Sequence, residues 1–156
     1  MKYPIGIQDF EKIIEDGYVY VDKTDLVYKL ANEGHVYFLS RPRRFGKSLL
    51  ISTLKYYFQG RKDLFKGLAI DKLEKEWAVY PVFHISFGTA NFTKPGTLDD
   101  VIDKYLSDAE NDYQIKTKVK DYGLRFKDIL KAAHKKAGRR AVVLIDEYDK
   151  PLLDVI

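Results

Sequence analysis

The sequence predicts a three-layer α/β fold with a mostly parallel central sheet. Short apolar segments rich in β-forming residues occur at residues 35–40, 81–87 and 141–145. Segments with apolar residues at helical spacing separate them, and such alternation is typical of a sheet covered by helices. The uninterrupted apolar run at residues 141–145 is what a strand buried on both faces requires. A chain of 156 residues is long enough to bury a sizeable core.

The predicted organisation is a lead-in over residues 1–34 followed by the core over residues 35–156. The lead-in should contain, in order, a helix over residues 8–15, a strand over residues 18–21 and a helix over residues 25–32. Thr24 is placed to cap the second of these helices, because a threonine oxygen can accept a hydrogen bond from the first turn.

The core helices follow the same reasoning. Residues 47–58 should form a helix whose apolar side chains share one face, and this face would pack on the sheet. The other expected helices cover residues 71–77, residues 97–113, and a segment marked by Phe126, Ile129, Leu130 and Ala133 that ends near Gly138. With the three strands, these elements give the order expected of a three-layer fold.

A basic turn follows the first core strand, with the sequence Ser40-Arg41-Pro42-Arg43-Arg44-Phe45-Gly46-Lys47-Ser48. A strand, a Gly-Lys-Ser turn and a helix in this order are typical of a phosphate-binding loop, or Walker A motif. Lys47 would reach the β- and γ-phosphates, and the Ser48 hydroxyl would bind Mg²⁺. The residues predicted to contact the nucleotide are Arg43, Arg44, Phe45, Gly46, Lys47, Ser48 and Leu49.

This loop departs from the usual pattern at one position. Arg41 stands where the pattern has a glycine, which is favoured there because it adopts left-handed backbone conformations without a Cβ penalty. Pro42 restricts Arg41 to extended conformations, so the chain would enter the loop differently.

A second motif, Val142-Val143-Leu144-Ile145-Asp146-Glu147, places two carboxylates at the carboxyl end of a core strand. Ligands of open α/β sheets bind at this edge, as in a Walker B motif. Asp146 would hold Mg²⁺ together with Ser48, and Glu147 would polarise the attacking water as a general base. A strand that simply ends in a polar turn is the alternative. The two motifs in one chain favour ATP hydrolysis with ATP and Mg²⁺ as ligands.

The composition of the chain excludes some kinds of site and indicates where the protein is located. The chain has no cysteine, which excludes disulfides and cysteine metal sites. The sequence lacks both a signal-peptide pattern and an apolar run of transmembrane length, so we expect a cytoplasmic protein with no membrane partner. Residues 41–70 carry a net charge of +7, against −3 for residues 1–40 and zero for residues 71–156. The basic excess indicates an anion or nucleic-acid site near the loop, or a solvated helix face at Arg61 and Lys62.

Several segments resemble the predicted AAA-ATPase-like family: Arg41-Pro42-Arg43-Arg44-Phe45-Gly46-Lys47-Ser48, Ile145-Asp146-Glu147-Tyr148-Asp149-Lys150-Pro151, Tyr20-Val21-Asp22-Lys23-Thr24 and Tyr80-Pro81-Val82. The resemblance covers nearly the whole chain, and Arg41 is usual in that family. It implies ATP binding through Gly46, Lys47 and Ser48, with Asp146 on Mg²⁺ and Glu147 catalytic. Members often carry a C-terminal nuclease-like domain of the restriction-endonuclease type, which implies nucleic acid as a partner of such a domain.

ATPases of this kind also resemble one another in having further strands after the acidic motif, whereas this sequence stops ten residues after Asp146. We therefore expect an incomplete sheet with an exposed apolar edge, self-association and weak hydrolysis by this chain alone. Three other functions stay open: a nucleotide-binding module for assembly or regulation without turnover, a small-molecule kinase, and a nucleic-acid-binding module.

Overall fold

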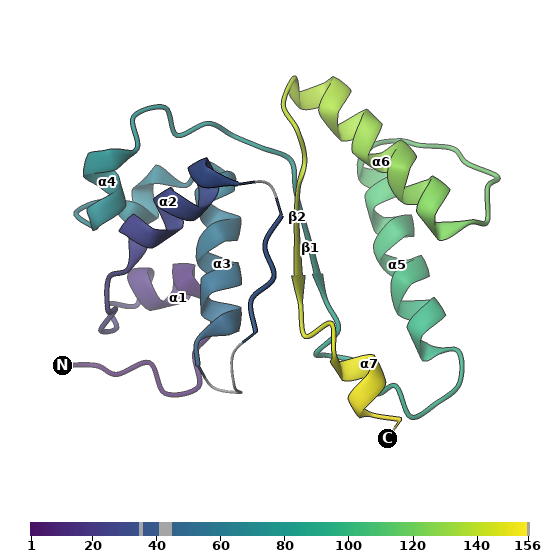
Figure 1. Cartoon of the computed structure of the whole chain (residues 1–156), viewed down its shortest axis with the longest axis horizontal. Coiled ribbons are helices and arrows are strands. Elements are labelled where there is room, and N and C mark those ends of the chain that lie inside the picture. Colours follow the sequence, from purple (N-terminus) through teal and green to yellow (C-terminus); the bar gives the residue numbers. More distant parts are fainter. Residues whose placement is uncertain (35, 41–44, 156) are drawn as a thin grey trace. The chain divides into compact units, whose positions relative to one another are not determined.

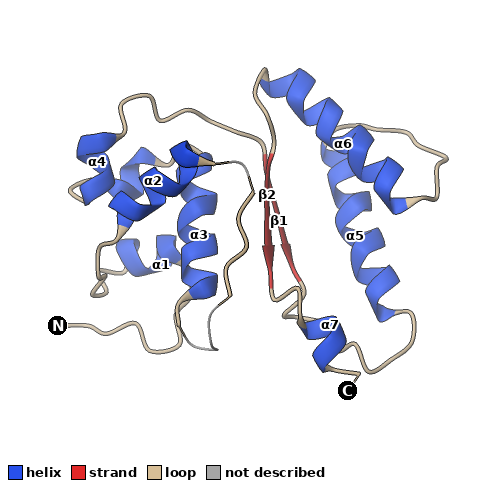
Figure 2. Cartoon of the chain, viewed as in Figure 1, coloured by secondary structure: helices blue, strands red, loops and turns tan. Residues whose placement is uncertain are grey.

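The computed structural model describes residues 1–34, 36–40 and 45–155. The chain divides into two compact units, Met1–Val79 and Tyr80–Ile156 (Figure 1). Regular structure in the first unit is entirely helical among its described residues, and the second unit contains a sheet (Figure 2). The division expected between residues 34 and 35 falls inside the first unit. It stays a prediction.

The first unit contains α1 (Phe10–Glu15), α2 (Thr24–Glu33), α3 (Lys47–Phe58), the 3₁₀ helix η1 (Lys62–Phe65) and α4 (Ala69–Leu73). Helix α3 has the predicted bounds. The strand expected at residues 18–21 is absent, and residues 36–40 of the first expected core strand are also irregular. His35 lies outside the described residues. A strand needs a neighbour that accepts its backbone hydrogen bonds, and neither segment pairs with another strand in the described part of the chain.

Helix α1 shares one hydrophobic core with the segments that follow α3. Phe10 and Phe65 are fully buried, and their ring centroids lie 4.8 Å apart. Phe65 in turn contacts Trp77, with a centroid distance of 5.3 Å. The N-terminal residues are therefore part of the structure that supports α3, because removing Phe10 would open a cavity beside it.

Thr24 caps a different helix from the one predicted. Its hydroxyl accepts a hydrogen bond from the Ile70 N–H (3.1 Å), and Asp22 accepts one from the Ala69 N–H (2.7 Å). Thr24 itself lies inside α2, is fully buried and donates its hydroxyl to Asp22 at 2.7 Å. The two side chains thus satisfy the first N–H groups of α4, 46 and 47 residues away in sequence.

The second unit contains β1 (Val82–Ser86), α5 (Thr97–Asp112), α6 (Tyr122–Ala137), β2 (Val142–Asp146) and α7 (Lys150–Leu153). Strands β1 and β2 are parallel, with Val82 opposite Val142 and Ser86 opposite Asp146. The α/β class and the parallel pairing are confirmed. A full three-layer P-loop core is not seen, because β1 and β2 are the only paired strands among the described residues.

Helices α5 and α6 lie together on one side of the strand pair (Figure 1). Arg125 of α6 is 8% exposed and binds both carboxylate oxygens of Glu110 in α5, at 2.8 and 2.9 Å. It also pairs with Asp103 and donates to the Ser107 hydroxyl. A buried arginine needs such partners, since an unpaired buried charge is strongly unfavourable.

In the described parts of the chain, no helix combines the length and the apolar character needed to cross a bilayer.

Candidate nucleotide site

Gly46 begins the predicted phosphate-binding helix in a left-handed conformation, with φ of 73°. No atom lies within 4 Å of the position that a Cβ would occupy, so backbone conformation, not crowding, favours glycine here. The Gly46 carbonyl accepts the Leu50 N–H at 3.0 Å and starts the helix. The first-turn N–H groups of α3 consequently lie at the open end of a helix, where anions bind.

Five of the predicted nucleotide contacts lie together at this helix end. They are Phe45, Gly46, Lys47, Ser48 and Leu49. Phe45 is 63% exposed, whereas Lys47, Ser48 and Leu49 are half-buried. Arg43 and Arg44 lie outside the described residues, as do Arg41 and Pro42.

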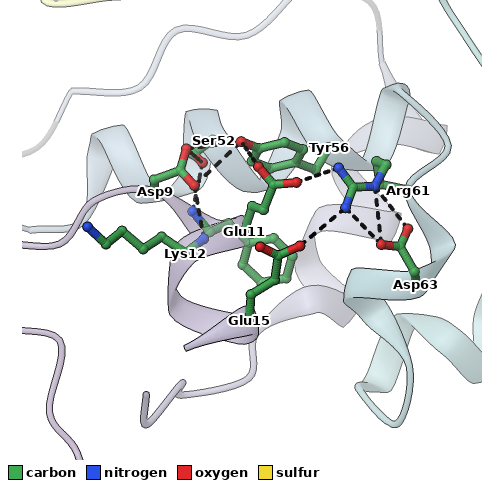
Figure 3. A network of polar contacts seen from close by, with 9 residues as sticks. Asp9, Glu11, Lys12, Glu15, Ser52, Tyr56, Arg61 and Asp63 are labelled. Atoms are coloured by element: carbon green, nitrogen blue, oxygen red, sulfur yellow. Dashed lines mark hydrogen bonds and ion pairs between the residues drawn. The ribbon is translucent and has the colours of Figure 1, made fainter. Parts of the chain in front are cut away.

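Helix α3 is attached to α1 by polar contacts that the sequence did not reveal (Figure 3). The Ser52 hydroxyl accepts the Phe10 N–H at 2.8 Å and donates to Asp9 at 3.3 Å. The Tyr56 hydroxyl donates toward Asp9 (3.2 Å) and Glu11 (3.0 Å). Burial and these two carboxylates raise the pKa of Tyr56 above its ordinary value. The contacts hold in place the helix that begins at the predicted phosphate-binding loop.

Arg61, just beyond the end of α3, completes this network (Figure 3). Its guanidinium pairs with Glu11, with Asp63 at 2.8 Å and with Glu15 at 3.6 Å. Three carboxylates thus surround one of the basic residues in the 41–70 segment. Arg61 is therefore engaged in the fold of the first unit.

In the second unit, Asp146 stands where the sequence predicts it, at the carboxyl end of β2. The side chain is 8% exposed, and Oδ1 accepts the Glu147 N–H at 3.0 Å. Oδ2 makes no hydrogen bond with the residues that the structure describes. A carboxylate with one oxygen open to a further ligand suits a cation or a bound water.

Glu147 has an unusual backbone conformation. Its φ is 52°, in the left-handed region that non-glycine residues seldom adopt. The carboxylate lies against Gly88, because a Cβ built on Gly88 would approach Glu147 Cδ to 2.8 Å. Strain of this kind costs on the order of 1 kcal/mol and clusters at functional sites. The role of Gly88 could not be predicted from the sequence, because the contact joins residues in separate loops.

Lys150 connects the acidic motif to the loop that follows β1. Its ammonium donates to the Ala90 carbonyl (2.9 Å) and to Asp154 (2.6 Å). Asp154 also accepts the Phe92 N–H at 3.1 Å. Lys150 therefore does more than shape the local turn, because its bond to Ala90 spans 60 residues of sequence.

The two predicted metal ligands belong to different units, Ser48 to the first and Asp146 to the second. Among the described residues, no cluster of three or more His, Cys, Asp or Glu side chains could hold a metal by itself. The donor types of Ser48 and Asp146, a hydroxyl and a carboxylate, are those that Mg²⁺ prefers. Their joint role stays a prediction.

Sequence comparison decides the family. A profile described as Predicted AAA-ATPase matches residues 4–156. The chain belongs to this family. Its members are classed as ATPase-like, which supports nucleotide binding at the level of the family. The resemblance noted in the sequence is confirmed.

Other comparisons add little about activity. This AAA-ATPase family member is 44% identical over 155 residues to an "Uncharacterized protein in vnfD 5'region" of Azotobacter chroococcum mcd 1. The match covers 98% of the chain but only 30% of that relative. No solved structure matches.

Proposed function

We propose that this chain is the ATP- and Mg²⁺-binding part of a P-loop ATPase that hydrolyses ATP in its full-length context. The observation that carries the proposal is the left-handed Gly46 at the start of α3, with Lys47 and Ser48 in the first turn. Open N–H groups at the start of a helix, with a lysine in the first turn, suit a polyphosphate. Family membership supports the same conclusion.

Each residue has a distinct part in the proposed site. The N–H groups of Lys47, Ser48 and Leu49 would bind phosphate oxygens, and the Lys47 ammonium would neutralise charge on the β- and γ-phosphates. When bound, Mg²⁺ supplies charge stabilisation for the transferred phosphoryl group. Ser48 and Asp146 are the residues that would hold it. Arg43, Arg44 and Phe45, in the same loop, would also contact the nucleotide.

Glu147 would accept the proton of the attacking water. Its carboxylate is exposed, and the strained backbone at φ of 52° together with Gly88 fixes its direction. A general base must be held within hydrogen-bond reach of the proton that it removes. The absence of a side chain on Gly88 leaves room for this carboxylate, so Gly88 belongs to the proposal as a positioning residue.

A second candidate is nucleotide binding without turnover, as an assembly or regulatory module. It is favoured by the apolar character of segment 36–40, in which Val36 is 92% exposed. We propose that this segment causes self-association, since exposed apolar strands pair with other chains. We also propose a cytoplasmic setting, with which a chain without cysteine is compatible.

Phosphate release from ATP, measured at saturating Mg²⁺, separates the two candidates. Glu147→Gln should remove turnover, and the control Glu76→Gln, at an exposed position of the first unit, should leave it unchanged. Binding of ATP by the parent chain without phosphate release would favour the second candidate. Undiminished turnover in Glu147→Gln would exclude Glu147 as the base.

A further inference from the structure

Charge in the second unit is strongly segregated along the chain. Residues 97–112 carry six acidic residues and one lysine, whereas residues 114–140 carry ten basic residues and two acidic ones. Residues 97–112 carry a net charge of −5, residues 114–140 carry +8 and residues 141–156 carry −3, so the sum of zero over residues 71–156 conceals the basic segment. A net charge of +8 within 27 residues is far from the chain average of +4 over 156.

Nine of the ten basic side chains are exposed. Arg125 is the exception, because it is buried against Glu110 and Asp103. The other nine are named the basic strip here: Lys116, Lys118, Lys120, Lys127, Lys131, Lys135, Lys136, Arg139 and Arg140.

Few acidic side chains in the described part of the protein pair with the basic strip and neutralise its charge. One ion pair involves it among the residues that the structure describes, between Lys131 and Asp128 at 3.5 Å, with both side chains at least half exposed. Exposed pairs of this kind contribute little. The Lys136 ammonium and the Arg139 guanidinium lie over the rings of Tyr113 and Tyr80, and both residues stay exposed. Most of the positive charge is therefore available to an external anion.

The strip has a regular spacing. Lys127, Lys131 and Lys135 recur every four residues of α6, which places them about 6 Å apart along the helix axis. The segment before α6 has no regular secondary structure, and its alternating lysines from Lys116 to Lys120 are exposed, whereas Ile115 and Thr117 are half-buried. This segment leads directly to the start of α6 (Figure 1). Lys127, Lys131 and Lys135 thus form a row along α6, and other strip residues lie in the segments directly before and after it, as an extended polyanion requires.

The chemistry of this surface favours nucleic acid over a membrane or a protein. The apolar face of α6 is occupied by the core, with Ile129 and Ala133 fully buried, so the helix has no free apolar face to insert into lipid. The strip also lacks exposed aromatic anchors of the kind that dominate protein interfaces. Rows of lysine and arginine are the usual contacts to phosphate backbones.

We propose that the basic strip binds the phosphate backbone of nucleic acid without sequence preference. This surface is distinct from the 41–70 segment of the first unit, and the proposal does not depend on ATP binding. Binding through backbone phosphates releases counterions, so the affinity should fall steeply as salt increases.

Fluorescence anisotropy with a labelled duplex of 25 base pairs and random sequence tests the proposal. The strip variant combines Lys127→Gln, Lys131→Gln and Lys135→Gln, since glutamine retains helix propensity while removing charge. The control combines Lys12→Gln, Lys72→Gln and Lys75→Gln, three exposed lysines of the first unit, and changes the net charge equally. Circular dichroism should confirm that both variants are folded.

We expect the strip variant to lose at least about tenfold in affinity at low salt, with the slope of log K against log salt reduced by about 3. The control should stay within about twofold of the parent, because its lysines lie outside the strip. The same pattern with a single-stranded 25-mer would also support the proposal. Lys47→Ala should bind the duplex as the parent does, so a failure of the nucleotide site would leave this result intact.

Three results would overturn the proposal. The first is no binding of either probe at low salt. The second is an equal loss in the strip variant and the control, which would show a general effect of net charge. The third is binding of phosphatidylserine vesicles with no binding of nucleic acid, which would assign the strip to a membrane surface.

Discussion

In the first unit, the groups proposed to meet the nucleotide are backbone N–H groups at the start of α3, whereas in the second unit they are the side chains of Asp146 and Glu147. The backbone groups need only a left-handed Gly46 and a helix held in place. The placement of these side chains depends on the left-handed backbone of Glu147 and on Gly88, which has no side chain to displace the carboxylate. It also depends on Lys150, which bonds to the Ala90 carbonyl in the neighbouring loop. Under this proposal, binding depends on the start of α3, including Lys47, whereas turnover depends on the placement of the Glu147 side chain, so the two should fail separately.

The two units also differ in what stabilises them, because the second unit contains a buried ion pair between Arg125 and Glu110. Breaking this pair should give the largest change in stability. Arg125→Met leaves Glu110 buried without its partner, which should destabilise the second unit by about 3 kcal/mol. Lys104→Met, in an exposed pair with Asp108, should change stability by less than about 0.5 kcal/mol. Denaturant titration followed by circular dichroism measures both.

The single tryptophan, Trp77, lies in the first unit against Phe65 and reports on that unit alone. Its fluorescence transition should not move in Arg125→Met if the units unfold independently. A transition that moves with the circular dichroism signal would show one cooperative structure instead, and the contrast between the units would be lost.

The next largest expected effect on stability comes from the contacts between α3 and α1. Ser52→Ala leaves the buried Phe10 N–H without an acceptor, so the first unit should lose about 2 kcal/mol by Trp77 fluorescence. Ser48→Ala makes the same chemical change in the same helix at a position without such a bond and should be nearly neutral in stability. Equal effects of the two substitutions would contradict the role given to Ser52.

Gly88→Ala tests the support of Glu147. The added methyl group would displace the carboxylate, so turnover should fall about tenfold, equivalent to about 1.4 kcal/mol, with ATP affinity unchanged. Gly123→Ala, at a glycine in the first turn of α6 where a methyl group meets only Asp121, serves as the control in the same phosphate-release assay. Full turnover in Gly88→Ala would remove Gly88 from the site.

The strain at Glu147 predicts a smaller effect. Glu147→Gly should stabilise the second unit by up to about 1 kcal/mol while it abolishes turnover. Gln114→Gly relieves a similar left-handed backbone, with φ of 56°, at the end of α5 and should stabilise without loss of activity. If only Gln114→Gly stabilised the protein in thermal unfolding, Glu147 would carry no strain.

A modest pH dependence should come from Asp22. Burial raises the pKa of this carboxyl, but hydrogen bonds from Thr24 and Ala69 outweigh burial and leave the pKa below its ordinary value. Its stabilising contribution is thus complete above the ordinary pKa and is lost as the pH falls through the lower, folded value. Asp22→Asn should lose part of this acid sensitivity in unfolding experiments followed by Trp77, and Asp25→Asn should retain it.

Local sequence patterns predicted the helix of the first motif and the strand of the second, but two other strand predictions were wrong. Helix α3 and its glycine start follow from a period of 3.6 residues and one Gly-Lys-Ser triplet, both contained within a few residues. The parallel pairing of β1 and β2 was likewise predictable from their apolar runs. The strand predictions at residues 18–21 and 35–40 rested on composition alone, whereas strand formation depends on a partner.

The missed features all join residues far apart in sequence. A threonine before a helical segment is typical of a local helix cap. The Thr24 hydroxyl instead accepts a hydrogen bond from the first turn of α4. The contacts from Ser52 to Asp9 and from Lys150 to Ala90 depend on packing that no local pattern encodes. The charge of the basic strip was visible in the sequence, but summing over a long segment concealed it.

Calorimetric titration with ATP and Mg²⁺ tests the central claim most directly, on the parent chain, Lys47→Ala and Glu147→Gln. We predict that the parent binds, that Lys47→Ala loses at least about a hundredfold in affinity, and that Glu147→Gln stays within about threefold of the parent. Full affinity in Lys47→Ala, or loss of binding in Glu147→Gln alone, would contradict the assignment of binding to the start of α3.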